Sequence, residues 1–212
     1  MPCRNYTGIV QVGFGKSGTT TVADFFVELG YNATCGFQMT AVLAAALEDR
    51  RQQQQQRPFE TVRRLCPRFY ISELSRVYFP NENIHLQLTD MSALRRAADP
   101  ADTLFVHCQR TTADWVRSVR AWGSLNQRLT VRDIEGLPPG HGGSAEELAR
   151  WYDAANAYLA FAFAYRTNYV HVQTDSNASL ADLSEFCGRG RGRVFPILNS
   201  NPRSRATVRT VQ

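Results

Sequence analysis

The segment Val12–Thr21 reads VGFGKSGTTT and combines three glycines, one lysine and a run of hydroxyl residues. The residues before it, Gly8–Gly13 (GIVQVG), predict a short buried strand, and apolar residues at helical spacing over Thr20–Leu29 predict a helix after it. A glycine turn between a strand and a helix start presents unpaired backbone N–H groups and the positive end of the helix dipole. Because Lys16 adds a full positive charge, this segment predicts an anion-binding loop.

Two common phosphate-binding motifs fit this loop only in part. The segment Gly15–Ser17 (GKS) matches the end of a Walker A loop, but Val10 stands where that motif needs a glycine, and Gly18 separates the serine from the helix. The glycines of Gly13–Gly18 form the G-x-G-x-x-G pattern of a dinucleotide site. That site also needs an acidic residue about 20 positions further on, and residues 32–47 contain none. An NADP-binding oxidoreductase of the Rossmann type therefore stays an alternative.

A third pattern, Lys16–Thr20 (KSGTT), resembles the 5′-phosphosulfate loop of sulfotransferases that use 3′-phosphoadenosine 5′-phosphosulfate (PAPS). That family also binds the 3′-phosphate with an arginine at the end of a later strand and a serine eight residues further on. The matching stretch here is FVHCQRTTADWVRSV, in which Arg110 follows a strand predicted over Thr103–Cys108 and Ser118 lies in the next helix. Strand ends and the helix starts that follow them meet at one rim of a parallel sheet. Lys16 and Arg110 are therefore expected to bind one nucleotide from two sides.

The resemblance implies a sulfotransferase that moves a sulfuryl group from PAPS, its co-substrate, to a hydroxyl (or amine) group of an acceptor without a metal. In this scheme Lys16 stabilises the leaving phosphate oxygen. The residues expected to bind PAPS are Lys16, Ser17, Gly18, Thr19, Thr20, Arg110 and Ser118. A catalytically inactive protein that binds PAPS or its product, adenosine 3′,5′-bisphosphate, is the other alternative, because the sequence does not fix the general base.

The general base must come from a different part of the chain. Many members of the family have a histidine after a strand, and the corresponding place here is Thr89-Asp90, after a strand predicted over Ile84–Leu88. A carboxylate at a buried strand end can have a raised pKa and accept a proton near neutral pH. Asp90 is therefore the predicted base. Its other interpretation is a cap for a helix that begins near Met91, and both stay open.

The elements that must position these residues alternate between strands and helices. Helices are predicted over Met39–Arg50, Thr112–Trp122, Leu148–Phe163 and Leu180–Phe186, and a strand over Tyr169–Gln173. Thr111–Asp114 predicts a capping box for the second of these helices. This order predicts an α/β fold of three α/β/α layers with a mainly parallel central sheet, and the resemblance implies the P-loop-like sulfotransferase fold.

Length and composition fit a single domain that covers residues 1–212, with 43% hydrophobic and 20% charged residues. Residues 51–58 include a glutamine run and are expected to form a flexible loop, and residues 200–212 a loose tail. The net charge of +5 fits a polyanionic small ligand as well as a nucleic acid. With the resemblance, the expected partner is a small-molecule or glycan acceptor with a hydroxyl group and no nucleic acid. No apolar run is long enough for stable membrane insertion.

Cysteines and sequons give opposite indications of the compartment. Five cysteines without regular spacing predict free thiols and a cytoplasmic protein. Three N-glycosylation sequons, which begin at Asn5, Asn32 and Asn177, are instead typical of a secretory lumen. The cytoplasm is the expectation and the Golgi lumen the alternative.

The acceptor itself is not identified by the sequence. Trp122, Trp151, Tyr152 and Tyr158 are candidates for an aromatic pocket, although their helical spacing is also typical of core residues. The four histidines are scattered and predict no metal site. Of these, His141 lies in a glycine-proline loop over residues 136–144 and is a candidate for part of a lid.

Overall fold

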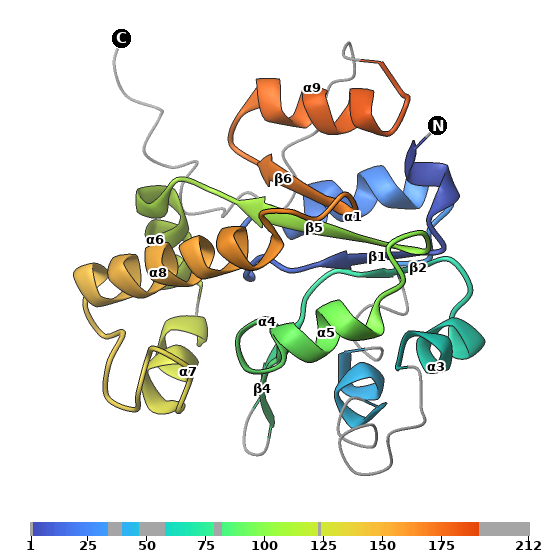
Figure 1. Cartoon of the computed structure of the whole chain (residues 1–212). Coiled ribbons are helices and arrows are strands. Elements are labelled where there is room, and N and C mark those ends of the chain that lie inside the picture. The colour runs from blue at the N-terminus through green and yellow to red at the C-terminus, as the bar shows by residue number, and fades with distance from the viewer. Residues whose placement is uncertain (1, 34–39, 47–57, 79–81, 123, 191–212) are drawn as a thin grey trace, which may run out of the picture.

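The computed structural model describes residues 2–33, 40–46, 58–78, 82–122 and 124–190. Its central sheet has four parallel strands in the order β2-β1-β5-β6. These strands are β1 (Gly8–Gln11), β2 (Phe69–Ile71), β5 (Thr103–Gln109) and β6 (Tyr169–Gln173). Helices flank both faces of the sheet (Figure 1). The predicted three-layer α/β fold with a mainly parallel sheet is confirmed.

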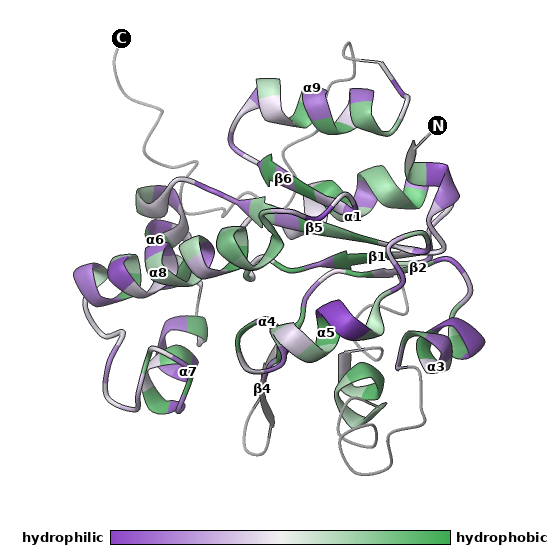
Figure 2. Ribbon diagram, in the orientation of Figure 1, coloured by the Kyte–Doolittle hydropathy of each residue, from purple (hydrophilic) through white to green (hydrophobic). Residues whose placement is uncertain are grey.

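The sheet buries side chains on both faces, because successive residues of a strand point to opposite sides. On one face, Ile9 and Leu104 pack with Phe25 and Phe26 of α1 (Thr19–Glu28) in a core that also includes residues of α9 (Asn177–Phe186). On the other face, Val10 and Phe105 belong to a second, larger core. Figure 2 shows the corresponding hydrophobic colour along the strands. Such burial on both faces is typical of a parallel sheet.

Most of the other helices contribute to the larger core. They are α3 (Pro58–Leu65), α4 (Leu86–Thr89), α5 (Met91–Ala97), α6 (Thr112–Ala121), α7 (Leu125–Val131) and α8 (Ala145–Phe163), and residues 40–46 are also helical. A short 3₁₀ helix, Pro2–Asn5, precedes β1. The predicted glutamine-rich loop and C-terminal tail lie outside the described residues, as do both ends of the helix predicted over Met39–Arg50.

The strand predicted over Ile84–Leu88 is wrong in most of its length. A separate antiparallel hairpin of β3 (Ser75–Tyr78) and β4 (Glu82–His85) ends at His85, and α4 begins at the next residue. The N–H group of Leu86 still donates to the carbonyl oxygen of Leu74 at 3.2 Å, which continues the pairing of Ser75 with His85 by one residue. A short apolar run such as IHLQL fits a strand or a helix equally well, so the sequence pattern alone did not decide the conformation.

The capping box predicted at Thr111–Asp114 is also wrong. Thr111 is the N-cap residue of α6 but makes no side-chain capping bond, and Asp114 pairs with Arg117 instead. A capping box is found at α8. There the N–H group of Glu147 donates to Ser144 Oγ at 3.1 Å, and the N–H group of Ser144 donates to Glu147 Oε2 at 3.3 Å.

The prediction that the cysteines are free thiols is corrected by the fold. Cys3 and Cys187 form a disulfide across a sequence separation of 184 residues. Cys66 is disulfide-bonded as well, and Cys108 is a buried free thiol. The spacing of the cysteines gave no sign of this pairing, because Cys3 and Cys187 meet only when both segments pack into the same hydrophobic core.

Candidate functional site

The loop between β1 and α1 is packed tightly against neighbouring strand ends. A Cβ atom at Gly13 would lie 2.1 Å from the carbonyl oxygen of Cys108, and one at Gly15 would lie 2.7 Å from Glu73 Oε1. Gly18 has a φ of 80° and is the N-cap residue of α1. The glycines are thus explained by close approach at two positions and by a left-handed turn at the third.

Two aromatic side chains from different helices hold this loop in place. Trp115 of α6 donates from Nε1 to the carbonyl oxygen of Gly15 at 2.9 Å. The hydroxyl group of Tyr152 of α8 lies 3.0 Å from Ser17 Oγ. The rings of Trp115 and Tyr152 stack with their centroids 4.1 Å apart and an angle of 10° between planes. Thr174, after β6, donates from Oγ1 to the carbonyl oxygen of Ser17 at 2.8 Å. The loop is therefore fixed from three sides.

Lys16 lies at the centre of this loop in a strained conformation. Its φ of 71° is in the left-handed region, which costs a non-glycine residue of order 1–3 kcal/mol. Its Nζ atom lies over the ring of Trp122, 3.6 Å from the centroid. Partial burial, followed by the charge of Arg110, lowers the pKa of Lys16, and the charge of Glu73 opposes this shift. The surrounding contacts hold the ammonium group at the rim of the sheet despite the backbone strain.

Arg110 is placed directly beside Lys16. It follows the last residue of β5, and its Nη1 atom donates to the carbonyl oxygen of Lys16 at 3.4 Å. Its own N–H group donates to the hydroxyl oxygen of Tyr152 at 3.1 Å. The two cations predicted from the sequence therefore open onto the same rim of the sheet, where their positive potentials add.

The remaining predicted phosphate-binding residues take different positions around these cations. Thr19 and Thr20 are half-buried in the first turn of α1, whose N-cap Gly18 offers no side chain to cap the helix. The buried hydroxyl group of Ser17 is bonded to Tyr152, so only the backbone of this residue can face a ligand. Ser118 is half-buried on α6, and within the described residues its hydroxyl group has no protein partner.

A carboxylate that the sequence analysis missed completes the site. Glu73 follows β2, the strand beside β1, and its Oε1 atom lies 2.7 Å from the position that a Cβ atom on Gly15 would take. Burial raises the pKa of Glu73 from 4.5 to about 7, although the charges of Arg128 and Lys16 act to lower it. A carboxyl group with this pKa is half ionised near neutral pH and can accept a proton there.

Glu73 was missed because its strand is very short. The three residues Phe69–Ile71 are fewer than a sequence pattern needs to predict a strand. The sequence did contain one weak sign of a strand end here. An apolar triplet, Phe69–Ile71, lies shortly after Pro67 and is followed directly by the polar pair Ser72-Glu73.

Asp90, the predicted base, occupies a different setting from the one expected. It follows the helix α4 and precedes α5, so it does not end a buried strand. Its side chain makes no capping bond to α5, and its Oδ2 atom accepts a hydrogen bond from Thr89 Oγ1 at 3.0 Å. The buried strand end on which the prediction of Asp90 as base depended is therefore absent.

Comparisons with protein-family models, with curated proteins and with solved structures found no significant match to this chain. Any assignment of function therefore depends on the residues themselves. Among the described residues, no three His, Cys, Asp or Glu side chains are grouped so that they could hold a metal ion. Within the same residues, no helix is both long and apolar enough to cross a bilayer.

Proposed function

We propose that this protein is a sulfotransferase that transfers a sulfuryl group from PAPS to an acceptor hydroxyl group. The observation that carries the proposal is the meeting of Lys16, Arg110 and Glu73 at the rim where α1 begins. Two cations beside a helix N-terminus suit a nucleotide with two separate phosphate groups. A carboxyl group with a pKa of about 7 beside them supplies the base that transfer to a hydroxyl group requires.

In the proposed reaction, Glu73 takes the proton of the acceptor hydroxyl group. The acceptor oxygen forms a bond to sulfur while the bond between sulfur and the bridging phosphate oxygen breaks. The electron pair of that bond stays on the phosphate oxygen, where Lys16 and the first-turn N–H groups of α1 stabilise the growing charge. The products are the acceptor sulfate ester, adenosine 3′,5′-bisphosphate and a proton held by Glu73.

Binding of the nucleotide is assigned to two groups of residues. The backbone of Ser17 and Gly18, with the backbone and hydroxyl groups of Thr19 and Thr20, holds the 5′-phosphosulfate. Arg110 and the unpartnered hydroxyl group of Ser118 hold the 3′-phosphate, because a guanidinium group and a hydroxyl group can both donate to one terminal phosphate.

The test compares thermal stabilisation by adenosine 3′,5′-bisphosphate, NADP and Mg-ATP, followed by transfer of labelled sulfate from PAPS to mixed hydroxylated acceptors. We expect stabilisation by the bisphosphate and transfer of label. Arg110→Ala is expected to raise the Kd of the bisphosphate about ten- to a hundredfold, since a hydrogen bond to a charged group contributes about 1.5–3 kcal/mol. Arg117→Ala, on the exposed side of the same region, is the matched control. Stabilisation by NADP alone would refute the proposal. Binding of the bisphosphate without sulfate transfer would instead support the alternative of a catalytically inactive nucleotide-binding protein.

We also propose an oxidising lumen, in place of the expected cytoplasm, as the compartment. Disulfides persist in oxidising compartments and are rare in the cytosol, and Cys3, Cys66 and Cys187 are all disulfide-bonded. The three sequon residues Asn5, Asn32 and Asn177 are exposed, as acceptors of a glycan must be. Expression through a eukaryotic secretory pathway should give a product whose mass falls on treatment with an endoglycosidase. An unglycosylated product with reduced Cys3 and Cys187 would contradict this assignment.

A further inference from the structure

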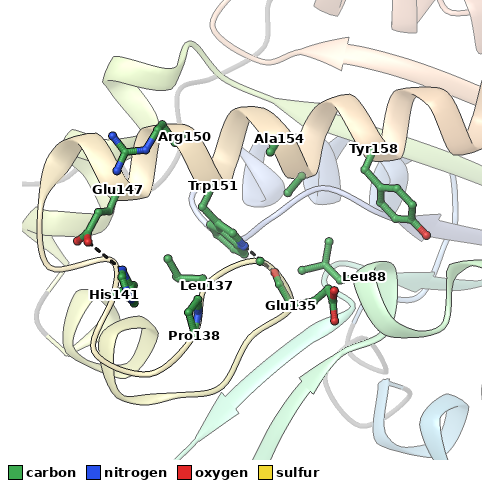
Figure 3. Close-up of a pocket in the computed structure, with 12 residues that line it drawn as sticks. Leu88, Glu135, Leu137, Pro138, His141, Glu147, Arg150, Trp151, Ala154 and Tyr158 are labelled. Atoms are coloured by element: carbon green, nitrogen blue, oxygen red, sulfur yellow. Dashed lines mark hydrogen bonds and ion pairs between the residues drawn. The ribbon is translucent and has the colours of Figure 1, made fainter.

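A pocket of about 550 Å³ lies between α8, the loop that precedes it and α4 (Figure 3). This volume is in the range of small-molecule sites, roughly 300–1,000 Å³. Its apolar lining comes from Trp151, Leu88 and their neighbours Leu137, Pro138, Ala154 and Ala155. Figure 3 shows His141, Glu147 and Arg150 toward one end and Leu88 and Tyr158 toward the other.

Both sides of this pocket belong to elements that contact the reacting groups. On one side, the ring centroid of Trp151 lies 5.0 Å from that of Phe14, which directly precedes Gly15 in the phosphate loop. On the other side, Leu88 is carried by α4, which begins at Leu86. The N–H group of Leu86 is bonded to the carbonyl oxygen of Leu74, the residue after Glu73. Two residues that line the pocket are therefore linked, through Phe14 and Leu86, to the loop that holds Lys16 and to the segment that holds Glu73.

The charged groups of the pocket limit the class of ligand. Glu147 is used within the protein, because its oxygens accept from His141 Nδ1 and from the N–H groups of Gly142 and Ser144. In the described part of the chain, the carboxylate of Glu135 has no such partner. Among the lining residues, the carboxylates of Glu135 and Glu147 outnumber the single guanidinium group of Arg150. An anionic acceptor such as an acidic polysaccharide would therefore meet repulsion, whereas an uncharged ring system would gain apolar contact with Trp151.

We infer that this pocket binds the sulfate acceptor and that the acceptor is a small, uncharged, ring-containing alcohol. This inference rests on the proposed function. The ring body packs against Trp151 between α8 and α4, and the hydroxyl group is presented to Glu73. Glu73 removes its proton as the oxygen bonds to sulfur and adenosine 3′,5′-bisphosphate leaves. The hydroxyl group of Tyr158, which has no protein partner among the described residues, is free to bond a polar group of the ligand at the end of the pocket where Leu88 lies.

The test uses a matched pair of acceptors on the full chain: 2-naphthol and 6-hydroxy-2-naphthoic acid, which adds a carboxylate to the same rings. Sulfate transfer from PAPS and binding in the presence of adenosine 3′,5′-bisphosphate are measured for both. We expect kcat/KM for 2-naphthol to exceed that for the acid at least about tenfold. Glu135→Gln is expected to reduce this ratio by relieving the repulsion of the acid.

A pair of variants on α8 locates the acceptor. Ala154→Phe places a ring in the pocket and is expected to raise KM for 2-naphthol at least about tenfold. It should leave the Kd of the bisphosphate unchanged. Ala157→Phe, at an exposed position of the same helix that does not line the pocket, should behave as wild type.

The outcomes separate this inference from the proposed function. If the bisphosphate does not bind, the proposed function fails and the acceptor role fails with it. If the bisphosphate binds and sulfate is transferred, but KM for 2-naphthol is the same in Ala154→Phe and Ala157→Phe, the inference alone is overturned. Faster transfer to an acidic polysaccharide such as chondroitin than to 2-naphthol overturns it as well.

Discussion

At the scale of single residues, the site depends on how three charges modify one another. Lys16 and Arg110 lie side by side and repel, which contributes to the lowered pKa of Lys16. The nearby carboxyl group of Glu73 moderates this repulsion, and burial raises its own pKa to about 7. A bound anion would relieve the repulsion between the cations, which is why this cluster favours an anionic ligand.

The first prediction concerns the ionisation of Glu73. The folded protein keeps this proton up to about pH 7, whereas an unfolded chain releases it near pH 4.5. Between these values the folded state binds more protons, so the free energy of unfolding falls as pH rises, by roughly 3 kcal/mol in total. Denaturant titrations of Glu73→Gln across this window should lack that fall. Glu146→Gln, at an exposed carboxyl group on α8, should retain it.

The same residue predicts the pH dependence of the reaction. Only the ionised form of Glu73 can accept a proton, so kcat/KM should rise with pH through about 7 and level off above it. In Glu73→Gln, transfer should fall at least about a hundredfold while the Kd of adenosine 3′,5′-bisphosphate stays within about twofold of wild type. A variant that keeps its transfer rate would show that another group, such as Asp90, is the base.

At the scale of elements, the loop between β1 and α1 is held by helices that are distant in sequence. The stacked rings of Trp115 and Tyr152 join α6 to α8, and each ring bonds to the loop. Tyr152 also accepts the N–H group of Arg110, so one phenol group links both predicted phosphate sites. The position of the loop therefore depends on the docking of α8 as much as on the local sequence.

We expect removal of the Tyr152 hydroxyl group to weaken nucleotide binding by a measurable amount. Tyr152→Phe leaves Ser17 Oγ and the N–H group of Arg110 without their partner, at a cost of about 1–3 kcal/mol in the free energy of unfolding. A looser loop should also raise the Kd of the bisphosphate about three- to tenfold. Calorimetric titration measures this change. Tyr165→Phe removes a phenol group from a side chain that is 99% exposed, and neither quantity should change.

The start of α8 offers a second test at this scale. Ser144→Ala removes the side-chain half of the capping box and should lower the free energy of unfolding by about 1 kcal/mol. Thr111→Ala, at the N-cap of α6, should cost less because Thr111 makes no capping bond there. Urea denaturation of both variants compares the two caps, and an equal loss would contradict the assignment.

At the scale of the whole molecule, the two ends of the described chain are joined. The disulfide between Cys3 and Cys187 closes nearly the full length of the domain and ties the segment before β1 to the end of α9. A cross-link over so long a loop restricts the unfolded chain strongly. The stability of the domain is therefore expected to depend on the redox state of its surroundings.

Replacement of this disulfide by the pair Cys3→Ser and Cys187→Ser should lower the free energy of unfolding by about 2–5 kcal/mol. Cys108→Ala removes a buried thiol without breaking a cross-link, and it should cost only about 1 kcal/mol. Thermal unfolding by calorimetry gives both values. If the paired serines cost no more than Cys108→Ala, the disulfide has no part in stability.

Much of the fold could be predicted from patterns that are local in sequence. The runs Gly8–Gln11 and Thr103–Gln109 are long and apolar enough to predict buried strands. The glycines around Lys16 predict the turn in which it lies. Short elements could not be predicted in this way. The strand Phe69–Ile71 has only three residues, and it gains its strand conformation by pairing with β1.

The sequence by itself determined the α/β class, the glycine turn between a strand and a helix, and the placing of Lys16 and Arg110 after two buried strands, because each depends on residue type and local spacing. Only the tertiary structure decided which carboxylate lies beside Lys16, that Cys3 pairs with Cys187, and that α8 supplies both a clamp and a pocket wall. Those features join segments far apart in the chain. Such contacts form when the core packs, and the local spacing of apolar residues does not specify which distant segments meet.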